Sequence, residues 1–184
     1  PVETRGVGLH SGEETRVRIA PAPPNHGIEF VRTDIEDAPS VPASIEHQSP
    51  KDRRTRLIRE QVEVETVEHF LAAAKALGVD NLRVEMTGSE FPGGDGSALP
   101  LMELLESGGL VEQKAEAKVL RLDEPIFVRD GNATLVALPT DKDCLTLQYV
   151  ASFEEPGVDS GSYQFDITPE TFRKEIAPAR TFCL

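Results

Sequence analysis

The sequence predicts an α+β protein with two domains, residues 1–113 and 114–184. Two observations lead to this prediction. The spacing of apolar residues changes from the two-residue period of strands to the period of a helix at residue 67. A polar stretch at 112–118 is typical of a linker, and strand patterns begin again after it. The chain is long enough for two small domains.

Strands dominate the first 65 residues. Residues 15–19 alternate apolar side chains with arginines and predict a strand that ends at Pro21. Residues 28–32 predict its hairpin partner. A Pro- and Asp-rich stretch, 33–52, is expected to form a long loop with short strand fragments, and 57–64 a further strand.

Two helices complete the first domain. The apolar residues of the first recur at helical spacing and are Val67, Phe70, Leu71, Ala74 and Leu77. Thr66 is the expected N-cap of this helix and Gly78 its end. A strand at 82–86 and a second helix, from an N-cap at Ser97 to Leu105, follow.

The second domain repeats part of this order. Strands are expected at 134–138, 145–150 and 162–167, and a helix at 169–176. The pattern around Thr134 repeats that around Thr15. Either the domains are related by duplication, or the two stretches share only the features of any β-hairpin. If they are related, the second domain is incomplete in this chain.

Composition excludes several classes of function. The chain carries 19 Lys and Arg against 32 Asp and Glu, a net charge of −13, so nucleic acid is not an expected partner. No apolar stretch approaches the ~20 residues of a transmembrane segment. The first residues do not show the basic and apolar regions of a signal peptide, so we expect no export signal. Cys144 and Cys183 form no recognisable spacing. We therefore expect a cytoplasmic protein.

Basic residues concentrate at one place on this acidic chain. Lys51, Arg53, Arg54, Arg56 and Arg59 lie within nine residues. They could bind a small anion such as a diphosphate, or they could form a solvated strand face beside acidic neighbours.

Glu68 and His69 are the candidates for chemistry. They fall in the first turn of the predicted helix, where the helix dipole favours a carboxylate. A histidine there could bind a metal ion while the neighbouring carboxylate acts as general base toward a metal-bound water, as hydrolytic zinc sites require. Alternatively, Glu68 only complements the dipole and His69 is an ordinary surface or core residue.

Four motifs carry a resemblance to a known family. They are Thr4-Arg5-Gly6-Val7-Gly8-Leu9-His10-Ser11-Gly12, Thr66-Val67-Glu68-His69, Glu90-Phe91-Pro92 with Asp95-Gly96-Ser97-Ala98, and Ala179-Arg180-Thr181-Phe182. In this order and spacing, the chain resembles the UDP-3-O-acyl-N-acetylglucosamine deacetylases of lipid A biosynthesis. The resemblance implies two related α+β domains, each a β-sheet with two helices packed in a layered sandwich.

The resemblance also implies roles for individual residues. His69 would bind zinc, Glu68 would be the general base, and Thr181 would stabilise the oxyanion. Phe182 and His10 would contact the substrate, although a structural role for His10 is the alternative. Phe153 would stack on uracil, or else be a core residue of its strand.

The reaction implied is removal of the N-acetyl group from an acylated UDP-amino sugar. The acyl chain of that substrate would bring the enzyme transiently to a membrane surface. No histidine follows His69, so the family's remaining zinc ligands are expected beyond Leu184, and these 184 residues alone are expected to bind zinc poorly and to be inactive. The alternative is a non-catalytic UDP-sugar-binding or scaffold module with the same fold.

Overall fold

The computed structural model describes residues 1–152 and 160–181, which belong to two compact units. The first unit contains residues 1–115 and the segment from Thr168 onward, and the second contains residues 116–167. The helix predicted at 169–176 therefore packs with the first unit, although it follows the second unit in the chain. The domain boundary at residue 113 and the relatedness of the domains remain predictions.

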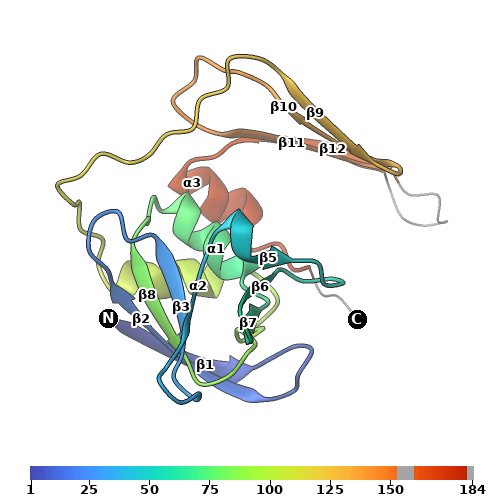
Figure 1. The fold of residues 1–184 in the computed structure, drawn as a ribbon. Coiled ribbons are helices and arrows are strands. Elements are labelled where there is room, and N and C mark those ends of the chain that lie inside the picture. The colour runs from blue at the N-terminus through green and yellow to red at the C-terminus, as the bar shows by residue number, and fades with distance from the viewer. Residues whose placement is uncertain (153–159, 182–184) are drawn as a thin grey trace. The chain divides into compact units, whose positions relative to one another are not determined.

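The first unit combines sheets and helices, which confirms the predicted α+β class (Figure 1). Its strands are β1 (Val2–Val7), β2 (Glu14–Pro21), β3 (Ile28–Arg32), β4 (Ser40–Pro42), β5 (Gln48–Ser49), β6 (Arg56–Arg59), β7 (Val62–Glu65) and β8 (Leu82–Met86). Its helices are α1 (Glu68–Ala76), α2 (Leu99–Ser107) and α3 (Pro169–Thr171), with a 3-10 turn at Ile45–His47 and a π-helical stretch, Phe172–Ile176, directly after α3.

The main sheet has five strands in the order β1-β2-β8-β3-β4. Strand β8 lies between β2, to which it is antiparallel, and β3, to which it is parallel. The predicted hairpin between residues 15–19 and 28–32 is therefore wrong. Each strand was recognisable from its own alternation. Besides β1, however, β2 pairs with β8, whose paired residues lie 61 to 69 positions further along the chain, and no local pattern can indicate this.

One face of this sheet forms the core of the unit. Side chains alternate along β2 between buried and exposed, so that Val17 and Ile19 face inward and the arginines face solvent. Helix α1 packs its buried face on this layer. Its Phe70 is fully buried, stacks on Phe91 with ring centroids 5.1 Å apart and meets Phe30 edge-on at 6.0 Å. Truncating such a residue typically costs about 3–5 kcal/mol.

The beginning of α2 is completed by a segment far away in the sequence. The carbonyl of Ala177 accepts hydrogen bonds from the backbone N–H groups of Ala98 and Leu99, both at 3.0 Å. It thereby serves the unpaired donors of the helix N-terminus. The predicted cap, Ser97, instead donates its hydroxyl to Asp95, so that prediction is wrong. Phe172 and Ala177 are buried in the same core.

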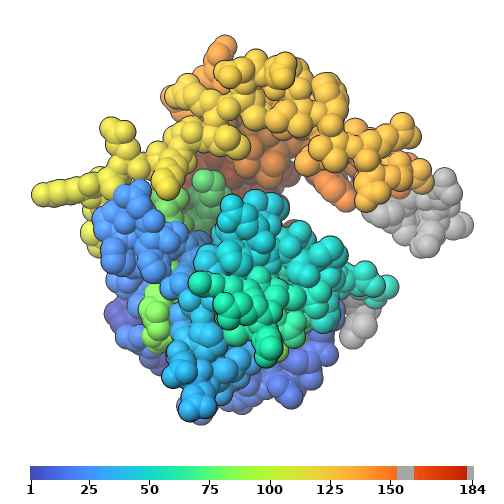
Figure 2. Space-filling view, viewed as in Figure 1, coloured from blue at the N-terminus to red at the C-terminus, as the bar shows by residue number. Residues whose placement is uncertain are grey.

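A smaller sheet, β5-β6-β7, brings the basic stretch next to α1. The predicted strand at 57–64 is in fact the hairpin of β6 and β7, which turns at Glu60 with φ +56. Leu57 and Val64 anchor the hairpin in the core. Its outer side forms part of the surface of the first unit, coloured cyan to teal in Figure 2.

The second unit consists of two antiparallel strand pairs, β9 (Ile126–Asp130) with β10 (Ala133–Ala137), and β11 (Thr146–Ala151) with β12 (Gly161–Asp166). Strands β10, β11 and β12 lie within one or two residues of the predicted positions, whereas β9 was not predicted. None of the residues in these four strands is buried. Within the described ranges of the chain, none of the helices has the length and apolar character that spanning a bilayer requires.

Candidate functional site

The site begins at Thr66, which joins β7 to α1 in a left-handed conformation with φ +58. This conformation is rare for a β-branched residue and costs about 1–3 kcal/mol unless its surroundings hold it. The N–H of Thr66 donates to the carbonyl of Thr55 at 2.9 Å, and its hydroxyl donates to Glu90 at 2.9 Å. Thr66 is therefore not the N-cap. That position belongs to Val67, and it has no side-chain hydrogen bond.

Glu68 and His69 are the first two residues of α1, as the sequence predicts, and both are half-buried. Their side chains leave the helix in different directions. The Glu68 carboxylate accepts the backbone N–H of Thr55 at 3.0 Å through Oε2. A carboxylate at this end of a helix also benefits from the helix dipole. The loop before β6 thus fixes the orientation of Glu68.

His69 lies next to Thr181. Its ring Nε2 is 3.1 Å from the Thr181 hydroxyl oxygen. Thr181 reaches this place because its own N–H donates to the carbonyl of Gly96 at 3.2 Å, which ties it to the loop before α2. The structure therefore brings together two residues, 112 positions apart in the chain, that the family resemblance assigns to one site.

A cavity of about 160 Å³ opens beside His69. It is mostly apolar, and its lining includes Thr66, His69, Pro92, Ser97, Leu101 and Leu104. Concave, largely apolar pockets with a few polar groups are typical of small-molecule sites. Glu68 does not line this cavity, because its carboxylate is turned toward Thr55.

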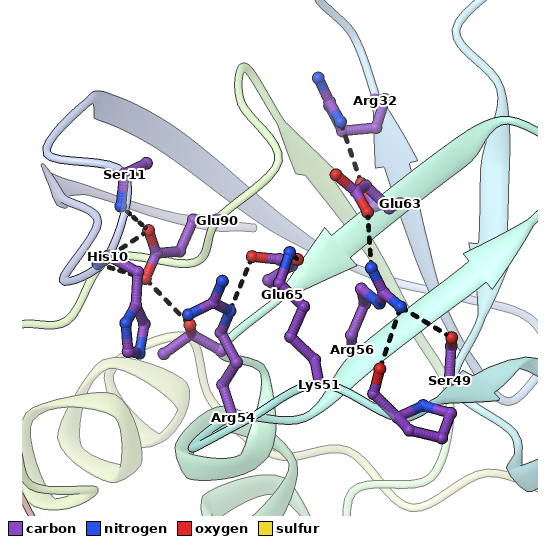
Figure 3. Close-up of polar contacts among 12 residues, drawn as sticks. His10, Ser11, Arg32, Ser49, Lys51, Arg54, Arg56, Glu63, Glu65 and Glu90 are labelled. Atoms are coloured by element: carbon purple, nitrogen blue, oxygen red, sulfur yellow. Dashed lines mark hydrogen bonds and ion pairs between the residues drawn. The ribbon is translucent and has the colours of Figure 1, made fainter.

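His10 lies in the turn between β1 and β2, and its side chain is exposed. Its backbone N–H donates to the carboxylate of Glu90, at 3.0 Å from Oε1 and 3.1 Å from Oε2. Glu90 thus bonds the His10 turn (Figure 3) and also accepts the Thr66 hydroxyl. The structural role of His10 is visible in these contacts, and its role toward substrate stays a prediction.

Two acidic residues beside the cavity have perturbed ionisation. Burial by itself raises the pKa of Glu90, but hydrogen bonds from His10, Ser11 and Thr66 outweigh it, so the pKa lies below its ordinary value. The side-chain and backbone hydrogen bonds of Ser97 lower the pKa of Asp95. Neither was predicted as a site residue. The available signal for Glu90 was its place in the Glu90-Phe91-Pro92 motif.

The basic stretch is largely engaged in internal ion pairs. Lys51 Nζ and Arg54 Nε each lie 2.8 Å from the carboxylate of Glu65, which is 6% exposed. Arg56 pairs with Glu63 at 3.6 Å (Figure 3). These pairs support the structural alternative, in which the cations lie beside acidic neighbours, because a diphosphate would have to compete with carboxylates already in place.

Comparison with known proteins places this arrangement in a family. The family model described as "LpxC: UDP-3-O-acyl N-acetylglycosamine deacetylase" matches residues 1–184. The chain belongs to this family. It is 40% identical to the UDP-3-O-acyl-N-acetylglucosamine deacetylase of Myxococcus xanthus over 97% of its length, and 40% identical to that of Trichormus variabilis, also over 97%. It spans only 56% and 65% of those relatives.

For a member of the LpxC family, the described residues do not form a complete metal site. Among residues 1–152 and 160–181, no group of three or more His, Cys, Asp or Glu side chains could hold a metal ion. Catalytic zinc sites use three protein ligands. His69, with Thr181 as its neighbour, offers a single ligand, so the part of the chain that the structure describes does not by itself fit a zinc ion.

Two of the substrate contacts predicted from the resemblance to the LpxC family, Phe153 and Phe182, lie outside the described residues. Their neighbours are placed differently. Thr181 belongs to the first unit next to His69, whereas Ala151 ends β11 in the second unit. The roles of both phenylalanines therefore stay predictions.

Proposed function

We propose that this chain is the part of an amide hydrolase that contributes a general base and an oxyanion donor, and that the complete protein removes the N-acetyl group from a UDP-3-O-acyl-N-acetylglucosamine in lipid A biosynthesis. The contact between His69 Nε2 and the Thr181 hydroxyl, at 3.1 Å, carries this proposal. This contact joins two separate family motifs. His69 lines the cavity and directly follows Glu68 in the chain.

Glu68 would take a proton from the attacking water. Amide hydrolysis adds the water oxygen to the carbonyl carbon, and a carboxylate within hydrogen-bond reach can accept the proton that is released. The N–H of Thr55 holds Oε2 of Glu68, so the proton would go to Oε1. Because the carboxylate is turned away from the cavity, we propose that it meets the water at the edge of the cavity, beyond the His69 ring.

Thr181 would donate its hydroxyl to the oxygen that becomes negative when water adds. One such donor is worth about 3 kcal/mol of the barrier. The Thr181 oxygen lies against His69, and the backbone bond to Gly96 positions the residue. Preorganisation of this kind is what makes oxyanion donors effective.

His69 would be one ligand of a zinc ion in the complete protein. The relatives extend well beyond the length that this chain covers, and we propose that the other ligands come from that additional part. When bound, the ion would supply Lewis acid chemistry at the carbonyl and the water. Phe153, Phe182 and His10 would contact the nucleotide and sugar. The cytoplasmic location and the brief approach to a membrane surface through the acyl chain stay predictions.

A second candidate is a non-catalytic module that binds a UDP-sugar. The largely apolar cavity beside His69 is the observation that such a module would use. In that case the cavity would bind the ligand, but the change of Glu68 would have no catalytic consequence.

The two functions are separated by one experiment on the full-length protein. Glu68→Gln keeps the shape of the side chain and removes the base, so we expect kcat to fall about 10²- to 10⁴-fold with unchanged zinc content. The matched control is Glu46→Gln, which changes an exposed carboxylate near His47 and should leave kcat unchanged. No deacetylation by the unmodified full-length protein would reject the hydrolase. Undiminished turnover of Glu68→Gln would keep the hydrolase and reject Glu68 as its general base.

A further inference from the structure

Glu90 is a buried carboxylate that neither proposed catalytic step uses. It is 2% exposed and follows β8 in the chain. Three residues donate hydrogen bonds to it: His10 and Ser11 through their backbone N–H groups, the latter at 2.7 Å, and Thr66 through its hydroxyl at 2.9 Å. Figure 3 shows its carboxylate directed at the turn that carries His10 and Ser11. A carboxylate can accept all of these bonds only in its charged form.

The Glu90 carboxylate occupies the space that a side chain at residue 8 would fill, and residue 8 is a glycine. A Cβ atom at that position would lie 2.4 Å from Oε2 of Glu90 and 2.8 Å from its carboxyl carbon. A Cβ atom essentially never lies this close to a non-bonded atom, and the Ser11 hydroxyl oxygen would be closer still, at 2.3 Å. A side chain at residue 8 would therefore displace Ser11 and Glu90. Glycine is required here by close approach and not by backbone conformation.

On its other side, Glu90 holds the strained residue before the proposed catalytic pair. Two hydrogen bonds hold Thr66 in its left-handed conformation. Its backbone N–H donates to the carbonyl of Thr55, and its hydroxyl donates to the carboxylate of Glu90. The preceding residue is fixed as well, since Glu65 pairs with Ser89 and Phe91 on either side of Glu90. Strained residues persist where their surroundings determine them from several directions.

The position of Thr66 decides where α1 begins. Two residues later comes Glu68 and three residues later His69, and Thr66 itself lines the cavity beside His69. A rotation at Thr66 would therefore move both side chains. An error of about 1 Å in the position of a catalytic group can cost about 10²-fold in rate.

We propose that Glu90 is a positioning residue of the active site, which locks the His10 turn and Thr66 to each other and thereby fixes Glu68 and His69. It does not touch the reacting atoms. The expected effect of Glu90 on turnover rests on the proposed function, whereas its effect on the placement of the Glu68 and His69 side chains can be tested separately.

The test uses Glu90→Gln, which keeps the size of the side chain and removes the charge, and Thr66→Val, which keeps the β-branch and removes the hydroxyl. In the full-length protein we expect each to lower kcat about 10- to 100-fold with KM within threefold. The double variant should be no slower than the slower single variant, because both break the same contact. Thr66→Ser retains the hydroxyl and should keep kcat within threefold.

A stability control separates positioning from general damage. Leu82→Ala creates a cavity at the far end of β8 from Glu90. It should lower the melting temperature at least as much as Glu90→Gln, yet leave kcat within threefold. If Leu82→Ala loses kcat as Glu90→Gln does, or if Glu90→Gln keeps kcat within twofold, the positioning role is wrong.

A spectroscopic measurement on the 184-residue chain decides the placement independently of turnover. In ¹H–¹⁵N spectra, Glu90→Gln and Thr66→Val should shift the amide signals of Glu68 and His69, whereas Leu82→Ala should not. Unshifted signals of Glu68 and His69 would overturn the proposal. If the signals shift but the unmodified full-length protein shows no deacetylation, the positioning of the pair stands and the proposed reaction fails.

Discussion

The side chains of His69 and Thr181 lie within hydrogen-bond distance, at 3.1 Å, although 112 residues separate them. Their contact depends on the backbone bond from Thr181 to Gly96 and on the carbonyl of Ala177 at the start of α2. The loop before α2 and the C-terminal segment therefore position Thr181 together, while α1 positions His69.

Replacing Thr181 tests the oxyanion donor. Thr181→Val removes the hydroxyl and keeps the shape, so kcat of the full-length enzyme should fall about 10²- to 10³-fold with little change in KM. Steady-state kinetics measures both. Thr181→Ser retains the donor and should stay within tenfold of the unmodified enzyme. Equal losses in the two variants would mean that packing, and not the hydroxyl, is what Thr181 contributes.

Zinc binding by the 184-residue chain should be weak. Catalytic sites use three protein ligands, and the described residues offer no group of three. After dialysis against zinc and then buffer, elemental analysis should find well below one equivalent, and deacetylation should be absent. His69→Ala should lower the remaining zinc, and His26→Ala, at a site paired with Glu29, should not. One tightly bound equivalent in the unmodified chain would contradict this prediction.

Acid should remove the contribution of Glu90 to stability. The folded protein lowers the pKa of Glu90 below the value of about 4.3 that an unfolded chain has. The stabilisation is therefore fully present above that value and is lost as the pH falls through the folded pKa. Urea unfolding from pH 7 to 3 should show that Glu90→Gln is less stable at pH 7 and that the difference shrinks below about pH 4.3. A difference that is constant with pH would mean that the charge is not involved.

Backbone amides of the second unit should exchange much faster than those of the main sheet. Strands β9 to β12 contain no buried residue, and isolated two-stranded sheets are only marginally stable in water. In the 184-residue chain, amides of β11 and β12 should exchange at least about 100-fold faster than those of β2 and β8. Hydrogen exchange followed by mass spectrometry measures this, and comparable protection in the two units would show that the second is stabilised in another way.

Local periodicity predicted most elements of the fold. The alternation at residues 15–19 indicated β2, that at 82–86 indicated β8 with the same bounds, and Gly78, with φ +67, ends α1 as expected. The errors concern partners from distant parts of the chain. Strand β8 inserts beside β2, and the Ala177 carbonyl replaces the Ser97 cap. Such choices depend on tertiary packing, which overrides local preference.

Only part of the candidate site could be predicted from the sequence. Their position at a helix start made Glu68 and His69 candidates, and the family resemblance assigned roles to them and to Thr181. No spacing rule could place Thr181 against His69. Glu90 belongs to one of the four family motifs, but the sequence indicated no role for it, because an acidic residue after a strand is common in loops. Its role follows from its burial and from the three residues that donate hydrogen bonds to it in the folded structure.

Because the Ala177 carbonyl completes the N-terminus of α2, the first unit lacks a piece of itself while the ribosome makes residues 116–167. At about 5–20 residues per second, that interval lasts roughly 3–10 s. During this time the early part of the chain can collapse. The backbone N–H groups of Ala98 and Leu99 and the apolar surface that later packs on Phe172 are still exposed to water. The nascent protein is thus exposed to chaperones and to aggregation until Phe172 and Ala177 emerge.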